Sequence, residues 1–396
     1  MTAVRPSPPG RDSLVGRHVV FLSWRDLGNP EGGGAELYLA KIAAGLVSHG
    51  CRVTVFSAAY AGAPPSEVVD GIRYVRRGSK LTVYLQGMLG LLLRRFGKVD
   101  LVVDVQNGIP FFSRLVTRRP VVVLVHHVHR EQWPVVYPGL TGRVGWWIEH
   151  WFAPRLYRSC QYVAVSEATR EELCALGVDE TRIAVVRNGT EPYLETPVPK
   201  SAEPTVCVVG RLVPHKQVEH AIDAVVRLRA ELPGLRLRVV GSGWWDASLH
   251  EYVDGRGAGD SVVFEGHVDE WRKHEIYQES WLLLLPSLKE GWGLVVGEAG
   301  MHGTPTVAYR SAGGTRESIA DGRSGVLVDD KEGFTEAVRE LLLDRGRRSE
   351  LSEGARAVSR QFGWAGAQDA FGRVLEAVLT GRRVSEDPPG RQGVVP

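Results

Sequence analysis

A loop with two glutamates contains the residue types best suited to chemistry. The segment after the apolar run WLLLLP reads SLKEGWGLVVGEAGMHG, in which seven residues separate Glu290 from Glu298. Carboxylates repel phosphate, so we expect these two to accept hydrogen bonds from hydroxyls. Each such charged bond contributes roughly 1.5 to 3 kcal/mol, and a sugar or a ribose offers two adjacent donors. The alternative is an ordinary helix start with solvated glutamates.

The residues between the two glutamates are expected to bind phosphate. Gly291 and Gly293 allow the backbone to approach a ligand closely, because they have no Cβ. A helix should begin near Leu294, so the amides of Trp292, Gly293 and Leu294 would form its N-terminus. Such a terminus binds anions through unpaired N–H groups and the positive end of the helix dipole.

A basic turn is the second candidate element. In VVGRLVPHKQ, Gly210 ends an apolar run, and Arg211 and Lys216 follow five residues apart across a turn that contains proline. Two cations on one loop can neutralise a diphosphate. The alternative is a solvated basic pair, which is the commoner role of such residues on a protein surface.

Two further glycine clusters are weaker signals. The segment PEGGGAE places Gly33 and Gly34 before a helix that is expected to open at Ala35, and GSG spans residues 241–243. Neither follows the G-x-G-x-x-G spacing of dinucleotide-binding proteins. The first cluster is consistent with a turn that faces phosphate, and the second with a turn from strand to helix.

Short apolar runs alternate with amphipathic segments in two blocks, a pattern that parallel sheets with crossover helices require. The runs are near-continuous in Val and Leu, which indicates strands buried on both faces. In the first block we expect helices at residues 35–48 and 81–96 and strands that begin at His18, Arg52, Ile72, Leu101, Val121 and Tyr162. In the second we expect helices at residues 219–231 and near 294–302 and strands that begin at Thr205, Leu235, Val262, Trp281, Thr304 and Ser324.

The two blocks predict an α/β protein with two Rossmann-like domains and parallel sheets. Ligands bind at the carboxyl ends of parallel strands, so two such edges are expected to face each other across a cleft. A proline-rich stretch is interpreted as the linker, because helix interiors and central strands exclude proline. The expected parts are a disordered segment 1–16, an N-terminal domain 17–190, a linker 191–204, a C-terminal domain 205–364, a helix 365–380 that crosses back to the first domain, and a disordered tail 381–396.

Composition excludes several classes of function. The 396 residues carry a net charge of only +2, so the strong basic field of a nucleic-acid-binding protein is absent. The four cysteines are widely spaced without a C-x-x-C pair, which argues against a zinc site or a disulfide framework and favours the cytoplasm. The first residues are rich in Pro and Ser and contain no apolar core of a signal peptide.

An apolar stretch with basic flanks raises the question of membrane contact. The stretch from Leu81 to Leu93 is shorter than the roughly 20 residues that span a bilayer. Within residues 73–98, however, it has Arg and Lys on both sides, and such a helix can bind anionic lipid at the inner membrane face. The alternative is a helix packed on a sheet with solvated arginines at its ends.

The loop, the basic turn and the motifs around them together resemble the retaining family-4 glycosyltransferases of the two-domain GT-B type. The resemblance extends from about Val19 to Leu379 and is strongest between Val206 and Val328. The most specific motif is the pair of glutamates in PSLKEGWGLVVGEAG. The supporting motifs are GGGAE, the RNG of residues 187–189, VGRLVPHK, GSG, VVFEGHV and GTPTVAYRSAGGTRESIADGRSGVLV.

The resemblance implies a role for each matching residue. Arg211 and Lys216 would hold the donor diphosphate, and the backbone of residues 291–294 would complete the phosphate cradle. Glu290 would bind hydroxyls of the transferred sugar, and Glu298 would bind the ribose. Family members also place a histidine beside the donor sugar after a strand of the first domain. In VVVLVHHVH the matching position is His126, with His127 and His129 as weaker candidates.

Two departures from the family pattern and one alternative remain. Gln217 occupies a position where glycine commonly follows the lysine, and Trp244 and Trp245 follow GSG where smaller or acidic residues are usual. The loop beside the donor is therefore expected to be reshaped. Three histidines within four residues also suggest a metal. We expect no metal or other cofactor, because the cation pair already balances the phosphates and no further ligand stands at suitable spacing.

By this resemblance the protein is expected to move a hexosyl group from a nucleoside diphosphate sugar, with UDP favoured, to a hydroxyl of a small-molecule or lipid-linked acceptor. The cysteine pattern favours the cytoplasm, and the Arg-rich, Lys-poor composition indicates a bacterial gene. Aromatic residues of the first domain would supply stacking faces for that acceptor; the alternative is that they belong to the core of the domain. The alternatives are a nucleotide-sugar epimerase, a coupling enzyme that joins two rings without a true sugar donor, and a non-catalytic nucleotide-sugar-binding module. A nicotinamide dehydrogenase is disfavoured, because neither opening strand precedes G-x-G-x-x-G.

Overall fold

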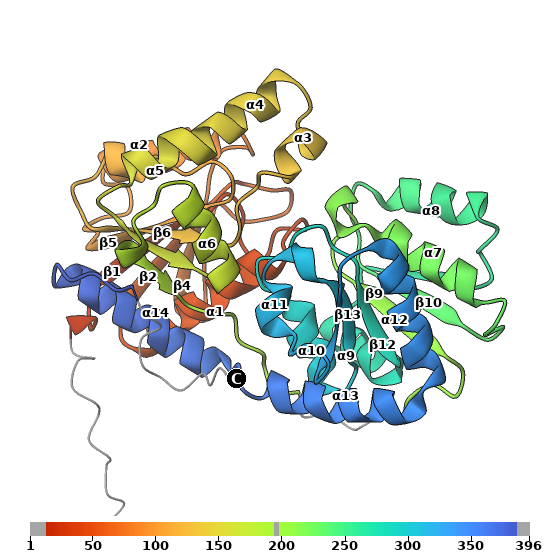
Figure 1. Cartoon of the computed structure of the whole chain (residues 1–396). Coiled ribbons are helices and arrows are strands. Elements are labelled where there is room, and N and C mark those ends of the chain that lie inside the picture. Colours follow the sequence, from red (N-terminus) through yellow and green to blue (C-terminus); the bar gives the residue numbers. More distant parts are fainter. Residues whose placement is uncertain (1–12, 194–197, 386–396) are drawn as a thin grey trace, which may run out of the picture. The chain divides into compact units, whose positions relative to one another are not determined.

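The computed structural model describes residues 13–193 and 198–385, which fold into two compact units (Figure 1). Within the described residues, unit 1 comprises 13–187 and 364–385, and unit 2 comprises 188–193 and 198–363. Each unit contains one sheet with helices on both faces, as expected for Rossmann-like α/β domains. Each is described on its own below.

Unit 1 is built on an eight-stranded sheet in the order β3-β4-β2-β1-β5-β6-β7-β8. All neighbouring strands are parallel except β3, which pairs antiparallel with β4 at the edge. The central strands are buried on both faces, in agreement with their continuous Val and Leu runs. The strands are β1 (His18–Leu22), β2 (Arg52–Ser57), β3 (Ser66–Val69), β4 (Ile72–Arg76), β5 (Leu101–Gln106), β6 (Val121–Val125), β7 (Gln161–Ala164) and β8 (Ile183–Val185).

The last helix of the chain belongs to unit 1. Helix α14 packs on α1, and the side-chain amide of Gln368 donates to the carbonyl of Lys41 at 2.7 Å. Phe371 stacks on Phe21 of β1, with ring centroids 6.2 Å apart. The helices of this unit are α1 (Gly34–Ser48), α2 (Val83–Leu92), α3 (Gln132–Val136), α4 (Leu140–Trp147), the π-helical turn η3 (Ile148–Phe152), α5 (Ala153–Leu156), α6 (Glu167–Ala175) and α14 (Trp364–Leu379).

Unit 2 contains a six-stranded, fully parallel sheet in the order β11-β10-β9-β12-β13-β14. The order reverses direction between β9 and β12, and ligands bind at such switch points outside the carboxyl ends of the strands. The strands are β9 (Thr205–Val209), β10 (Arg236–Val240), β11 (Val262–Gly266), β12 (Leu282–Leu285), β13 (Thr306–Tyr309) and β14 (Gly325–Val328).

The helices of unit 2 bury their apolar faces on this sheet. Ile222 and Val225 of α7 and Phe334 of α12 are fully buried in one core with Val206 and Leu284. The helices are α7 (Val218–Leu228), α8 (Asp246–Gly255), α9 (Glu270–Glu279), α10 (Leu294–Met301), α11 (Thr315–Ser318), α12 (Lys331–Leu343) and α13 (Arg345–Ser359). None of the helices within the described ranges of either unit is long and apolar enough to cross a membrane.

The structure differs from the expected organisation at three segments. In the predicted N-terminal disordered segment, Leu14 is buried and its carbonyl accepts from the Cys51 thiol; residues 1–12 lie outside the described part. In the predicted tail, the backbone of Val384 pairs in both directions with the side-chain amide of Gln161, and residues 386–396 lie outside the described part. In the predicted linker, Lys200 donates to the carbonyl of Ser280 at 2.6 Å, which binds this segment to unit 2; residues 194–197 lie outside the described part.

Candidate functional site

The two loops that carry the predicted donor-binding residues are neighbours in unit 2. Strands β9 and β12 pair in parallel, so the loops that follow them leave the same edge of the sheet. The amide of Leu288 donates to the carbonyl of His215 at 2.8 Å and joins the loops directly. The basic turn and the glutamate loop, 74 residues apart in sequence at Lys216 and Glu290, therefore form one site.

Lys216 and Glu290 form an ion pair across these loops. Lys216 Nζ lies 2.5 Å from Glu290 Oε1, and the two side chains are 21% and 10% exposed. Lys216 ends a short 3-10 turn (Pro214–Lys216), and Gln217 follows with a φ of 49°. That left-handed conformation favours glycine. It explains why glycine is common at this position in the family that the sequence resembles.

Gly210 and Arg211 border a small hollow beside this pair. The hollow is lined on one side by the end of β9 and the basic turn, and on the other by Leu285, Pro286 and Ser287 after β12. The Ser287 hydroxyl is buried and has no hydrogen-bond partner within the described ranges. A buried hydroxyl without a partner is costly, and a bound ligand would satisfy it.

The GSG segment packs against the backbone of the basic turn. Gly241 has a φ of 128°, and a Cβ added there would lie 1.9 Å from the carbonyl oxygen of Gly210. A Cβ on Gly243 would lie 2.1 Å from the carbonyl oxygen of Leu212, whose own amide donates to the carbonyl of Ser242. Both glycines are thus needed for close approach of two backbones. The sequence identified the motif but not this role.

The two tryptophans after GSG shape the same region. Trp245 Nε1 donates to Glu219 Oε1 at 2.6 Å, while Trp244 is 61% exposed and meets Trp245 edge to face at 5.5 Å. Trp245 therefore fixes the start of α7, which directly follows Lys216 and Gln217. The loop is reinforced by an aromatic side chain at a position where smaller residues are usual in the family.

The residues between the glutamates adopt the expected helix start. Gly293 has a φ of 88°, and α10 begins at Leu294. Within the part of the chain that the structure describes, no residue accepts a hydrogen bond from the amides of Gly291, Trp292, Gly293 or Leu294. These amides are available to an anion. The Trp292 side chain is buried, however, so this residue can contribute only through its backbone.

The backbone of Glu290 pairs with residues 312–314 in a strand-like contact. Its amide donates to the carbonyl of Ala312 at 2.7 Å, and its carbonyl accepts from the amide of Gly314 at 3.0 Å. A Cβ on Gly314 would lie 2.1 Å from the carbonyl oxygen of Gly291. The AGG segment of the family motif therefore positions the glutamate loop, a role that the motif match alone did not indicate.

Glu298 lies on α10 and is held by residues that the sequence reasoning missed. Tyr277 donates to Glu298 Oε2 at 2.9 Å, and Lys273 Nζ lies 3.2 Å from the same oxygen. Both come from α9, whose polar composition gave no hint of a role. Burial and the adjacent Glu298 carboxylate raise the pKa of Tyr277 well above its usual value, so this phenol remains a donor.

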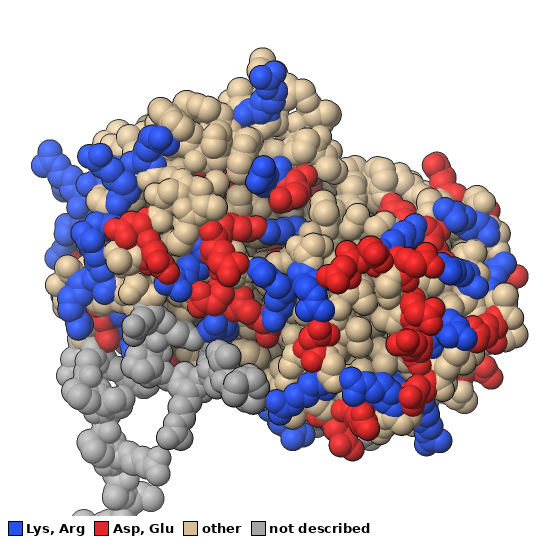
Figure 2. All heavy atoms as spheres, viewed as in Figure 1, with Lys and Arg blue, Asp and Glu red and all other residues tan. Residues whose placement is uncertain are grey.

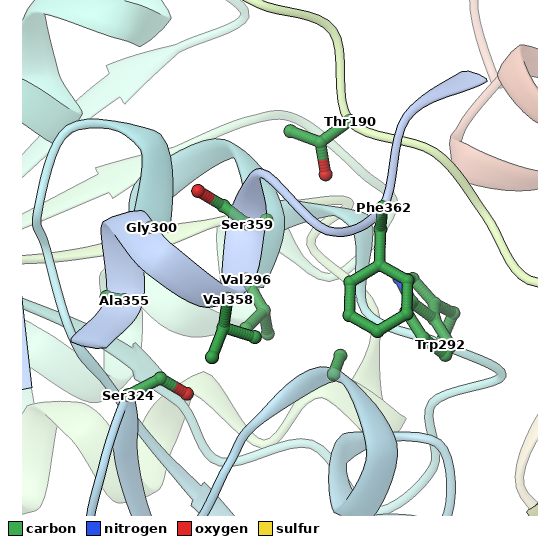
Figure 3. Close-up of a pocket in the computed structure, with 11 residues that line it drawn as sticks. Thr190, Trp292, Val296, Gly300, Ser324, Ala355, Val358, Ser359 and Phe362 are labelled. Carbon is green, nitrogen blue, oxygen red and sulfur yellow. The ribbon is translucent and has the colours of Figure 1, made fainter. Parts of the chain in front are cut away.

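A second hollow in unit 2 lies behind the glutamate loop and is distinct from this site (Figure 3). Its walls are Thr190, Trp292 and Phe362 on one side and the facing surfaces of α10 and α13 on the other. Trp292 and Phe362 meet edge to face at 5.0 Å. No charged side chain lines this hollow, so it suits the packing of α10 rather than the binding of a diphosphate.

His126, the predicted histidine of unit 1, directly follows β6 and is buried. Its ring meets Tyr38 edge to face at 5.3 Å, and its Nε2 has no hydrogen-bond partner within the described ranges. Burial lowers the pKa of His126 to about 4, although the charge of Glu36 opposes this shift. The imidazole is therefore neutral near pH 7, and its Nε2 can form a hydrogen bond with a polar ligand.

The pKa of His126 predicts how the stability of unit 1 depends on pH. The unfolded chain binds a proton near pH 6.5, whereas the folded chain does so only near pH 4, so acid favours unfolding. We expect this residue to remove up to about 3 kcal/mol of stability as the pH falls through that interval. The free energy of unfolding, measured with urea at several pH values, should depend less steeply on pH for His126→Gln than for the wild type. His49 is a partly exposed histidine of the same unit. If His49→Gln reduced the pH dependence of the free energy of unfolding equally, the assignment would be contradicted.

The neighbouring histidines are occupied by protein contacts. His129 Nδ1 lies 3.1 Å from Glu149 Oε1, and Trp133 Nε1 donates to Glu149 Oε2 at 2.6 Å. His127 Nε2 lies 3.3 Å from Gln132 Oε1. Among the residues with described positions, no group of three or more His, Cys, Asp or Glu is arranged to hold a metal ion. The buried Glu149 lies in the π-helical turn η3 and was not singled out from the sequence.

Gly33 and Gly34 lie at the start of α1 in unit 1. The amide of Gly33 donates to Glu36 Oε2 at 2.8 Å, and Arg25 Nε donates to Glu36 Oε1 at 3.1 Å. Arg25 and Glu36 are both buried, so this ion pair fixes the glycine turn. The turn is structurally defined, and its part in donor binding remains a prediction.

Two α/β units built on largely parallel sheets, with a basic turn and a glutamate loop in the second unit, define the GT-B class of glycosyltransferases. The chain matches the family model "Glycosyltransferase Family 4" over residues 32–193 and "Glycosyl transferases group 1" over residues 193–358. It is 31% identical to a D-inositol 3-phosphate glycosyltransferase of Xylanimonas cellulosilytica, over 87% of this chain and 91% of that protein. The chain belongs to glycosyltransferase family 4, and it is a glycosyltransferase.

Solved structures show the same fold. Sucrose-phosphate synthase from Thermosynechococcus elongatus superposes with a TM-score of 0.78 at 18% identity, over 92% of this chain and 100% of that chain. Anabaena HepE in complex with UDP-glucose gives a TM-score of 0.70 at 19% identity, over 91% and 99% of the two chains. The predicted GT-B fold and the predicted family are confirmed.

Proposed function

We propose that the protein is a retaining hexosyltransferase that uses a nucleoside diphosphate sugar, with UDP as the favoured nucleotide. The observation that carries the proposal is the Lys216–Glu290 pair, in which a cation from the loop after β9 meets a carboxylate from the loop after β12. Arg211 borders the same hollow. The structural likeness to HepE, which was solved with UDP-glucose, supports the choice of nucleotide.

In the proposed reaction the bond between the sugar's anomeric carbon and the diphosphate breaks, and the acceptor oxygen bonds to that carbon on the same face. Negative charge develops on the leaving diphosphate. Arg211, Lys216 and the amides of residues 291–294 bind this charge more strongly in the transition state than in the ground state. The departing phosphate takes the acceptor's proton, so no side chain is required as a covalent nucleophile.

The remaining site residues bind the uncharged parts of the donor. Glu290 accepts hydrogen bonds from hydroxyls of the transferred sugar. Glu298 accepts from the ribose through Oε1, because Tyr277 and Lys273 both contact Oε2. The buried Nε2 of His126 binds a hydroxyl of a sugar substrate. Each assignment matches a polar group with the ligand atom of complementary hydrogen-bonding character.

We propose a small-molecule or lipid-linked alcohol as the acceptor and the cytoplasm, at the inner face of the membrane, as the place of reaction. The relative in Xylanimonas cellulosilytica is named for D-inositol 3-phosphate, which supports a polyol as the first acceptor to test. We also propose that no metal is required, because Arg211 and Lys216 supply two positive charges to the diphosphate.

One set of incubations tests the proposal. Purified protein is incubated with UDP-, GDP- or dTDP-hexoses, with and without D-inositol 3-phosphate or other polyols, and the products are identified by mass and by anomeric configuration. We expect a glycoside with the donor's anomeric configuration, formed only when acceptor is present and unaffected by EDTA. Conversion of the donor without acceptor would indicate an epimerase. Nucleotide binding without any product would indicate a binding module, and loss of activity in EDTA would reject the metal-free mechanism.

A further inference from the structure

Helix α2 of unit 1 packs Val83 and two glycines inward and turns several large apolar residues outward. A Cβ on Gly87 would lie 2.8 Å from the Phe111 ring, and a Cβ on Gly90 would lie 2.6 Å from the Phe96 ring. A surface helix of a soluble protein normally shows the opposite pattern, with polar residues outside. The leucines on and beside α2 that are between 55 and 82% exposed are Leu81, Leu85, Leu92 and Leu93.

The continuous helical segment from α4 through η3 repeats this pattern. Gly145 faces inward, where a Cβ would lie 2.3 Å from the Trp133 ring. The outward positions are spaced by four, three and four residues, which places them on one helical face. These outward side chains, between 41 and 73% exposed, are Leu140, Val144, Trp147 and Trp151.

The two exposed faces belong to one surface. Just before α2, Lys80 Nζ lies 5.7 Å from the ring centroid of Tyr137, which directly follows α3. Elsewhere the ring of Phe112 is 6.0 Å from that of Phe152, which in turn stacks on Trp147. Residues 81–151 hold eleven of the nineteen large hydrophobic side chains that are strongly exposed in the described ranges. Single exposed apolar residues are ordinary, but such a cluster marks an interaction site. We call it the α2–α4 surface.

The chain around the α2–α4 surface is strongly basic. Residues 71–166 contain fourteen Lys and Arg against four Asp and Glu, whereas the whole chain has a net charge of +2. Two of the four acidic residues, Asp104 and Glu149, are buried, and so is one of the fourteen basic residues, Arg76. Figure 2 shows Lys and Arg among uncharged side chains where α2 and α4 lie, with Asp and Glu gathered on other parts of the molecule.

From these observations we infer that the α2–α4 surface docks on an anionic lipid bilayer. The exposed leucines and tryptophans enter the interface between headgroups and acyl chains, and the surrounding Arg and Lys bind the lipid phosphates. Tryptophan suits this interface because its apolar ring carries a polar N–H. A second copy of the chain fits this surface less well, since two strongly basic faces would repel each other. The inference goes beyond the proposed sugar transfer and does not depend on it.

The test is co-sedimentation with vesicles of phosphatidylcholine alone or with added phosphatidylglycerol. We expect the full chain to pellet with the anionic vesicles at low salt, to remain in solution with the neutral ones, and to be partly released as salt is raised. Arg95→Glu with Lys98→Glu should lower the partition coefficient by about tenfold or more. Trp147→Ser with Trp151→Ser should lower it by a similar factor through loss of apolar contact, with an unchanged salt dependence.

Matched controls come from unit 2. Arg236→Glu with Arg345→Glu makes the same change in net charge, and Trp271→Ser removes another half-exposed tryptophan. Both should bind as the wild type does, and thermal unfolding shows whether each variant is folded. The inference is overturned if the wild type fails to pellet, or if the controls lose as much binding as the surface variants. A dimer that Leu92→Glu disrupts, without any binding to vesicles, would assign the surface to self-association instead.

Discussion

Lys216→Ala is expected to lower kcat/KM by about 30- to 1,000-fold, equivalent to roughly 2 to 4 kcal/mol of transition-state stabilisation. Two effects add in this variant. The cation proposed to face the developing phosphate charge is lost, and the Glu290 carboxylate, only 10% exposed, loses its partner at 2.5 Å. Steady-state rates with a saturating acceptor would measure the change.

A matched lysine shows whether the effect belongs to the site. Lys331 also pairs with a carboxylate in unit 2, since its Nζ lies 2.5 Å from Asp223 Oδ2, but it is on α12. Lys331→Ala should leave kcat/KM within about threefold of the wild-type value. The double variant Lys216→Ala with Glu290→Ala should lose less transition-state stabilisation than the sum of the two single losses in free energy, because the two side chains interact directly. Near-normal turnover of Lys216→Ala would reject the phosphate role.

The two glutamates should give different phenotypes when each is replaced by alanine. Glu298→Ala should weaken the binding of UDP by about 10- to 100-fold, because a carboxylate that accepts from a ribose hydroxyl contributes roughly 1.5 to 3 kcal/mol. Glu290→Ala should not weaken the binding of UDP, because UDP lacks the hexose that Glu290 is proposed to bind, and it should lower kcat by about 100-fold. Isothermal titration calorimetry with UDP, together with steady-state kinetics, separates the two results.

Glu270 provides the control for Glu298. It also contacts Lys273, with Oε2 2.8 Å from Nζ, but it is largely exposed and Tyr277 donates to Glu298 instead. Glu270→Ala should bind UDP as the wild type does. If Glu270→Ala and Glu298→Ala weakened UDP binding equally, the effect would come from Lys273 rather than from a ribose contact. Identical kinetic and binding changes in Glu290→Ala and Glu298→Ala would contradict their separate roles.

The sequence predicted the parts of the fold that local patterns determine. Runs such as VVVLV and WLLLLP gave β6 and β12, since uninterrupted apolar residues indicate strands buried on both faces. The edge strands β3 and β8 were not predicted. They are three to four residues long, and Ser66–Val69 is largely exposed, so it shows no apolar pattern. The helix expected over residues 81–96 extends only from Val83 to Leu92.

The sequence motifs predicted the residues of the basic turn and of the glutamate loop, but not their contacts. The pairing of Lys216 with Glu290 follows from the parallel pairing of β9 with β12, which sequence patterns indicate only through the family resemblance. The partners of Glu298 were missed, because Tyr277 and Lys273 lie on α9, and nothing in EWRKHEIYQE distinguishes a ligand-site helix from a solvated one. The supporting role of Gly241 was missed as well, because it depends on a neighbouring strand's loop.

The contact between Lys216 and Glu290 has a consequence for the end of each catalytic cycle. Within unit 2 the lysine has the Glu290 carboxylate as its partner. In the proposed mechanism, a donor draws Lys216 to its diphosphate and compensates Glu290 for the lost contact, because the hexose hydroxyls donate hydrogen bonds to the carboxylate. After transfer of the hexose, the proposed roles leave Glu290 without those hydroxyls, so that it would compete with the spent nucleotide for the ammonium group of Lys216. The same pair that helps to bind the donor would then speed the release of the product and keep the enzyme from stalling.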